Sequence, residues 1–101
     1  MFTVVYRWRV KPGKEAVFCD VWRRRTEKIH AVSGSYGARL HRQPDGAYFS
    51  IALWPSREAW ESNVPLPDDE EDARLFRESV AETLPPITGD VIDDYWKQAF
   101  D

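Results

Sequence analysis

The chain opens with Phe2-Thr3-Val4-Val5-Tyr6-Arg7-Trp8-Arg9-Val10, in which two sets of positions alternate. One set is wholly apolar and consists of Phe2, Val4, Tyr6, Trp8 and Val10. The other set consists of Thr3, Val5, Arg7 and Arg9. A period of two is typical of a β-strand that buries one face. We therefore expect a first strand whose apolar side packs against a layer built by the rest of the chain.

A helix is predicted to follow this strand. Lys11-Pro12-Gly13-Lys14 breaks the strand, because proline and glycine interrupt regular elements. From Glu15 onward, apolar residues recur at spacings of three, four and seven as far as Ser33-Gly34-Ser35. They are Phe18, Val21, Trp22, Ile29 and Val32. This spacing is typical of an amphipathic helix with one apolar face.

A β-hairpin comes next. The predicted strands run from Tyr36 to Gln43 and from Ala47 to Trp54. Between them lies Pro44-Asp45-Gly46, and a short Asp-Gly turn between two apolar stretches is a strong hairpin signal.

The second half of the chain predicts two helices and a strand. Ser56 is a suitable cap for a short helix from Arg57 to Asn63. The acidic residues 68–72 suit a helix N-terminus, and the apolar stripe of that helix reaches Pro85. The stripe comprises Ala73, Leu75, Phe76, Val80 and Leu84. We expect the last strand at residues 90–100, with a terminal helix as the alternative.

This order of elements predicts an α+β ferredoxin-like sandwich formed by one domain, residues 1–101. Its four-stranded antiparallel sheet has helices on one face only. We expect the uncovered face to carry Val5 and, by strand parity, Tyr48, Ala52 and Trp54. Because so large an apolar surface is unusual on a monomer, we expect a homodimer that packs sheet to sheet.

Composition and charge exclude several classes of protein. The formal charge of −3 combines +7 for residues 1–42 with −10 for residues 43–101, so the two halves attract each other. With this acidic balance, nucleic-acid binding is not favoured. No apolar stretch approaches the length that crosses a bilayer, and the start of the chain has no secretory pattern. A single cysteine, Cys19, fits a reducing compartment, so we expect a cytoplasmic protein.

Three segments carry a resemblance to a known family: residues 10–14, residues 34–42, and Leu53-Trp54-Pro55-Ser56-Arg57-Glu58-Ala59-Trp60. Together they resemble the antibiotic biosynthesis monooxygenase family, whose members are dimeric α+β barrels. The likeness covers about the first two-thirds of the chain. The chain departs from the family pattern at Ser33-Gly34, where Pro-Gly is common, and in the acidic insertion at residues 65–72.

The resemblance implies a pocket between helices and sheet in which some members oxygenate polycyclic phenols with O2, using neither metal nor flavin. Such a site needs a dry apolar wall, a proton acceptor and hydrogen-bond donors for the anion. The candidate binding residues are four aromatic side chains and one amide: Tyr6, Trp8, Trp22, Trp60 and Asn63. Arg25 or Arg42 adds charge if either points inward. No catalytic residue is assigned, and no cofactor or metal is expected.

The sequence also allows functions other than oxygenation. The second hypothesis is a non-catalytic binding or stress-response barrel. Such a barrel either uses the same pocket only to hold a ligand or has no pocket because the tryptophans fill it. The haem-degrading relatives of this fold use an asparagine on the first strand, with a tryptophan and a haem-ligating histidine in the second helical region. In this sequence Tyr6 falls near the place of the asparagine and Asn63 near the place of the tryptophan, and no histidine follows His41. Haem binding is therefore disfavoured. We expect His41 in the dimer interface, His30 on the surface and Cys19 as a buried thiol.

Overall fold

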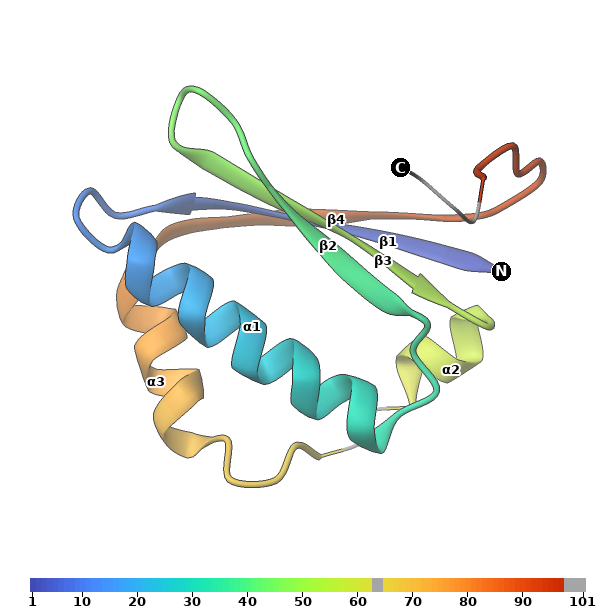
Figure 1. Ribbon diagram of the computed structural model, residues 1–101, viewed down its shortest axis with the longest axis horizontal. Helices are drawn as coiled ribbons and strands as arrows, with labels where there is room; N and C mark the ends of the chain where they lie inside the picture. The colour runs from blue at the N-terminus through green and yellow to red at the C-terminus, as the bar shows by residue number, and fades with distance from the viewer. Residues whose placement is uncertain (63–64, 98–101) are drawn as a thin grey trace.

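The computed structural model describes residues 1–62 and 65–97 and shows a four-stranded antiparallel sheet with helices on one face (Figure 1). In chain order the elements are β1 (Phe2–Val10), α1 (Glu15–Val32), β2 (Gly37–Arg42), β3 (Ala47–Trp54), α2 (Arg57–Glu61), α3 (Glu70–Ser79) and β4 (Val80–Asp90). The spatial order of the strands is β2-β3-β1-β4. The predicted ferredoxin-like α+β sandwich is confirmed.

The first half of the chain matches the predicted elements closely. β1, α1 and β3 have the expected bounds to within one residue. α2 begins where predicted because the Ser56 hydroxyl accepts a hydrogen bond from the backbone N–H of Ala59, at 3.1 Å. α2 ends at Glu61, and Asn63 lies outside the described residues.

The second half differs from the prediction at α3. This helix does start in the acidic run, but it ends at Ser79, so the predicted continuation to Pro85 is wrong. Val80 and Leu84 belong instead to β4, which pairs antiparallel with β1. Pro85 and Pro86 are tolerated inside β4 because it is an edge strand, with one side of its backbone free of ladder partners.

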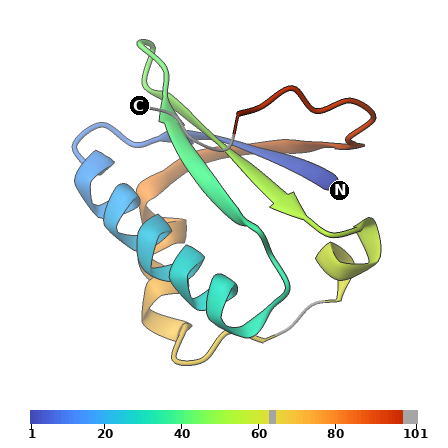
Figure 2. The ribbon, with the colours of Figure 1, turned by 45° about the vertical axis from the view of Figure 1, so that its right-hand side comes forward.

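The strand predicted at residues 90–100 is also wrong. Residues 91–97 form neither helix nor strand, and residues 98–101 lie outside the described part of the chain. The segment 91–97 turns onto the side of the sheet opposite the helices (Figure 2). Its side chain Trp96 contacts Arg39 of β2, whose guanidinium carbon lies 5.2 Å from the centre of the indole ring.

The core lies between the helices and the sheet, and three residues predicted for the uncovered face belong to it. Tyr48, Ala52 and Trp54 are each less than 10% exposed. The register pairs each of them with an apolar residue of β1: Tyr48 with Trp8, Ala52 with Val4, and Trp54 with Phe2. Directly opposite residues of an antiparallel pair share a face, so these side chains must point toward the helices with their partners.

The face away from the helices carries a different apolar set. Its partly exposed members include Val5, Phe49, Ile51 and Leu53, and Ile87 of β4 is 55% exposed. Two polar atoms on these strands, Arg7 Nε and His41 Nδ1, are buried without a hydrogen-bond partner in the described part of the chain. We call this side of the sheet the open face.

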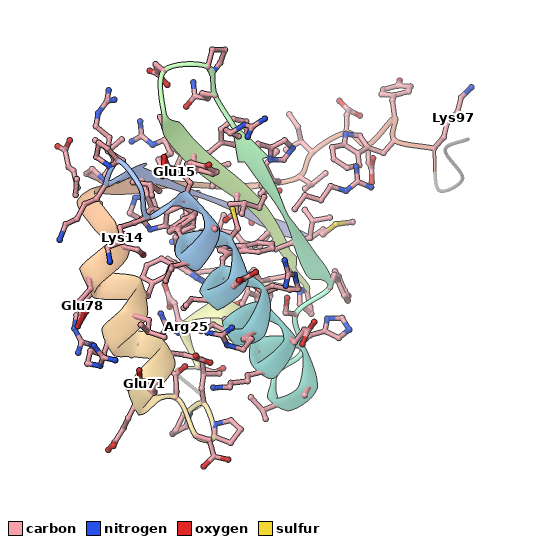
Figure 3. All side chains as sticks on the ribbon, turned by 60° about the vertical axis from the view of Figure 1, so that its left-hand side comes forward. Lys14, Glu15, Arg25, Glu71, Glu78 and Lys97 are labelled. Carbon is pink, nitrogen blue, oxygen red and sulfur yellow. The ribbon has the colours of Figure 1, made fainter. Side chains whose placement is uncertain are left out.

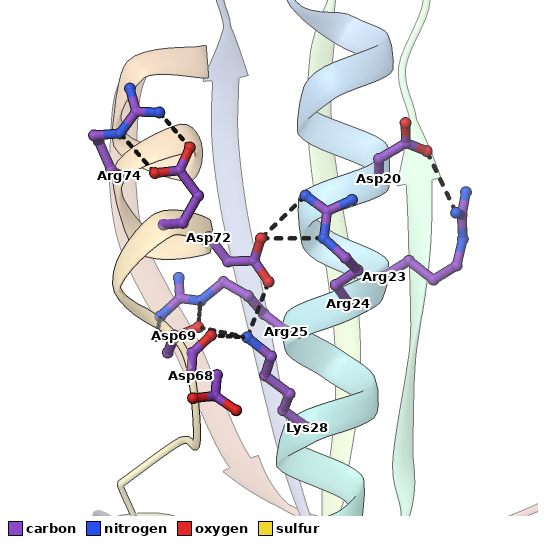
Figure 4. A network of polar contacts seen from close by, with 10 residues as sticks. Asp20, Arg23, Arg24, Arg25, Lys28, Asp68, Asp69, Asp72 and Arg74 are labelled. Atoms are coloured by element: carbon purple, nitrogen blue, oxygen red, sulfur yellow. Dashed lines mark hydrogen bonds and ion pairs between the residues drawn. The ribbon is translucent and has the colours of Figure 1, made fainter.

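The opposite charges of the two halves meet between α1 and α3 (Figure 4). Arg24 of α1 contacts Asp72 of α3 at 3.0 Å, and Lys28 Nζ donates to the same carboxylate at 3.0 Å. Arg25 forms a third pair with Asp69. The expected attraction between the halves therefore fixes α3 against α1, since Asp72 is only 12% exposed.

Stability is expected to depend on pH through Asp72. Hydrogen bonds from Arg24 and Lys28 hold the pKa of Asp72 below its usual value of 3.8. A lowered carboxyl pKa stabilises the fold above the usual value, and this contribution is lost as the pH falls through the folded-state pKa. Asp72→Asn should therefore be less stable than the wild type near neutral pH. Urea unfolding should show this gap closing as the pH falls below the usual carboxyl pKa of 3.8; a gap that stays constant with pH would contradict the assignment.

Candidate functional site

A cavity of about 350 Å³ lies between α1, α3 and the sheet. Aromatic side chains form much of its wall: Tyr6, Trp8, Trp22, Trp54 and Phe76. They come from β1, α1, β3 and α3, so the cavity exists only when both layers are assembled. A mostly apolar wall with a few polar groups is typical of a small-molecule site.

Tyr6 and Trp60 are joined by a hydrogen bond in this region. The indole Nε1 of Trp60 donates to the Tyr6 hydroxyl oxygen at 2.7 Å. The Tyr6 proton has no acceptor among the described residues, so it is available to a ligand. Burial raises the pKa of Tyr6 above its usual 10.0. The phenol therefore stays protonated at neutral pH and acts as a donor.

A second cavity of about 250 Å³ adjoins the first on the side of α2. Tyr6, Ile29 and Trp54 line both cavities, and Trp60 lines the second. The Tyr6 side chain thus stands between the two spaces.

Two further residues of the wall carry polar groups. The indole Nε1 of Trp54 is buried and has no hydrogen-bond partner among the described residues. An unpaired buried donor costs roughly 1–3 kcal/mol, and this nitrogen has almost no accessible surface, so Trp54 contributes its ring and not its N–H to the wall. Ser50, the strand partner of Tyr6, also lines the cavity and is 2% exposed.

Arg25 is the one charged residue among the described residues that line the first cavity. Figure 3 shows it between α1 and α3, whereas Glu71 and Glu78 lie on the outer side of α3. Its guanidinium carbon lies 5.4 Å from the centre of the Phe76 ring. Of the two arginines considered from the sequence, Arg25 reaches the cavity, and Arg42 is an exposed residue at the end of β2.

A family model for antibiotic biosynthesis monooxygenase matches residues 1–63, more than half of the chain. The chain belongs to this family. The matched part runs from β1 through α2 and supplies most of the cavity wall, whereas α3 and β4 follow it. No curated protein matches the sequence.

Solved structures of family members share the fold over nearly the whole chain. SnoaB of Streptomyces nogalater, a cofactor-independent oxygenase, has a TM-score of 0.76 at 20% identity, with 95% of this chain and 97% of that one covered. A protein of Chloroflexus aurantiacus J-10-fl with the same family name gives 0.75 at 14% identity, covering 94% and 96%. Another antibiotic biosynthesis monooxygenase gives 0.74 at 17% identity, covering 92% and 100%. Identities this low show a shared fold and nothing finer.

The structure brings most of the sequence candidates together. Tyr6, Trp8 and Trp22 line the first cavity, and Trp60 joins them through its bond to Tyr6. Trp8 also has a core role, because it is 6% exposed and packs against other aromatic rings. The sequence prediction did not include Trp54 in the site. Its face follows from its pairing with Phe2 of β1, and no turn or other local signal in the sequence sets that register.

His41 and Cys19 are not among the described residues that line either cavity. His41 stacks on Phe49, with ring centres 4.5 Å apart, and both residues lie on the open face. Cys19 is partly exposed and packs against the aromatic cluster around Phe18. In the described part of this family member, no group of three histidine, cysteine or carboxylate side chains is arranged to hold a metal ion. None of the described helices has the length and apolar character of a membrane span.

Proposed function

We propose that this family member binds a flat aromatic molecule, a polycyclic phenol or quinol, and oxygenates it with O2 without a metal or flavin. The observation that carries the proposal is the Tyr6 hydroxyl, which is held by Trp60 in an aromatic wall and has its own proton free for a ligand. Family membership supports it. The similarity in fold to a cofactor-independent oxygenase is in keeping with it.

With an anthrone, the proposed chemistry converts a ring methylene to a carbonyl: one methylene group and one O2 molecule give one carbonyl group and one molecule of water. The substrate first loses a proton to water, and the resulting anion combines with O2 to form a hydroperoxide, which eliminates water to leave the carbonyl. The negative charge of the anion collects on the ring oxygen, where a preorganised donor stabilises it. Tyr6 is suited to donate to that oxygen because Trp60 fixes its hydroxyl in the cavity wall and the hydroxyl proton has no acceptor among the described residues. The aromatic wall excludes water from the reactive anion.

Oxygen uptake tests this proposal. Wild-type protein should accelerate O2 consumption by an anthrone or a naphthoquinol above the uncatalysed rate, in an oxygen-electrode assay. With the anthrone, one product carbonyl should form for each O2 consumed. Binding of these compounds without any acceleration would contradict the proposed reaction.

A second candidate function is ligand binding without turnover. The observation that favours it is the absence of a carboxylate or histidine among the described residues that line the first cavity, so no side chain there is an evident proton acceptor. Under this alternative the same compounds bind with similar affinity, and oxygen uptake stays at the background rate. The oxygen-electrode assay therefore separates the two functions.

We also propose that two copies of the chain pack together through the open face. The partly exposed apolar side chains of this face support a partner surface there. Light scattering should give twice the chain mass of 11.8 kDa. Ile51→Glu, at the centre of the face, should reduce the mass to that of one chain. Glu27→Lys, on the exposed side of α1, is the control; a wild-type monomer would contradict the proposal.

A further inference from the structure

Arg25 is the one charged residue among the described residues that line the first cavity, whose wall is largely apolar. Its side chain is 30% exposed, and Asp69 fixes its orientation. Arg25 Nε donates to Asp69 Oδ1 at 3.1 Å, and Nη2 donates to Oδ2 at 3.0 Å (Figure 4). Phe76 packs under the same guanidinium. The group is therefore held in one place before any ligand arrives.

Asp69 uses only one edge of the guanidinium. A guanidinium has five N–H donors arranged in two forks, and each fork matches the two oxygens of a carboxylate. Asp69 occupies the fork made by Nε and Nη2. The other fork, made by Nη1 and the second N–H of Nη2, has no partner among the described residues. One edge of Arg25 is thus free to bind a second oxygen pair.

The surrounding charges leave Arg25 able to attract an anion. Lys28 Nζ lies 3.7 Å from Asp69 Oδ1, so the Asp69 carboxylate is paired with two cations, Lys28 and Arg25. Arg24 and Lys28 both contact Asp72, and neither lines the cavity. Arg25 is consequently the cation that the cavity presents to a ligand.

We infer that the cavity selects a planar aromatic carboxylate, whose carboxylate binds the free fork of Arg25 while its rings lie on the aromatic wall. Trp8, Trp22 and Phe76 supply that wall beside Arg25. Arg25 is the anion-binding residue, and Asp69 is a positioning residue that acts through it. This inference rests on the proposed function, because it requires that the cavity take an aromatic molecule.

Isothermal titration calorimetry with 2-naphthoate and 2-naphthamide tests the inference, because the two compounds have nearly the same shape and differ in charge. Wild-type protein should bind 2-naphthoate at least about 10-fold more tightly than 2-naphthamide. Arg25→Gln should weaken 2-naphthoate binding about 10- to 100-fold and leave 2-naphthamide binding unchanged. Arg25→Lys should recover part of the loss, since it keeps the charge without the fork.

Arg24→Gln is the matched control. It removes an equivalent ion pair between α1 and α3 but no cavity group, so it should leave the binding of both compounds unchanged. Equal binding of the two compounds by the wild type would overturn the inference while leaving the proposed function standing. An equal loss of both in Arg25→Gln would do the same. Failure of the wild type to bind either compound, or an anthrone, would overturn both.

Discussion

Replacing Tyr6 by phenylalanine is expected to lower the rate of oxygen uptake about 100-fold, with little change in the affinity for the aromatic compound. The substitution keeps the ring in the cavity wall and removes only the hydroxyl that Trp60 holds. Because negative charge on the substrate oxygen grows as the proton leaves, the lost donor matters more for reaction than for binding. Initial rates in an oxygen electrode, with anaerobic calorimetry for affinity, measure the two effects separately.

Tyr48→Phe is the control for this experiment. Tyr48 is buried in the same core at 4% exposed, but it is not among the residues that line the cavity. Its loss of a hydroxyl should leave the oxygen-uptake rate unchanged. A Tyr6→Phe protein with the wild-type rate would show that the reaction does not depend on this donor.

Phe18→Ala is expected to destabilise the fold by about 3–5 kcal/mol, a large share of the roughly 5–15 kcal/mol that stabilise a domain. Phe18 is fully buried, and three aromatic rings pack around it. Its ring centre lies 5.4 Å from those of Trp8 and Phe76 and 5.2 Å from that of Tyr48. Because these neighbours come from three different elements, truncation leaves a cavity that no single element can move to fill. Urea unfolding measures the loss.

Val32→Ala serves as the comparison, since Val32 is 38% exposed at the end of α1. It should change the free energy of unfolding by less than about 1 kcal/mol. A Phe18→Ala protein as stable as Val32→Ala would mean that the aromatic cluster is not the centre of the core.

The elements that sequence reasoning placed well have strong local signals. β1 alternates without a break, α1 has a regular apolar stripe, and the turn at residues 44–46 fixes the hairpin. Each signal depends only on neighbouring residues. Local patterns therefore determined most of the α+β architecture, including the helix-facing side of β1 but not that of β3.

β4 was misplaced because two patterns overlap there. Phe76, Val80 and Leu84 recur every four residues, which is the spacing of a helix. The structure nevertheless changes from helix to strand at Val80, because this segment pairs with β1. Pro85 and Pro86 strengthened the error, since prolines are rare within central strands and are accepted here only at the sheet edge.

For the site too, sequence patterns identified some of the residues, but their contacts and orientation depend on residues far away in the chain. Tyr6 and Trp60 were identified from strand pattern and motif, but their hydrogen bond joins residues 54 positions apart. Trp54 was assigned to the wrong face because its orientation depends on pairing with Phe2. Whether Arg25 points inward depends on Asp69 and α3, which no pattern within α1 reveals.

The central claim is that the space between α1 and the sheet admits a flat aromatic molecule. Anaerobic calorimetric titration with an anthrone tests it most directly, using wild-type protein and two variants of α1. Thr26 lines the cavity, whereas its neighbour Glu27 is exposed. We expect saturable binding of one molecule per chain, which Thr26→Trp abolishes and Glu27→Trp retains. Absence of binding to the wild type, or undiminished binding to Thr26→Trp, would contradict that claim.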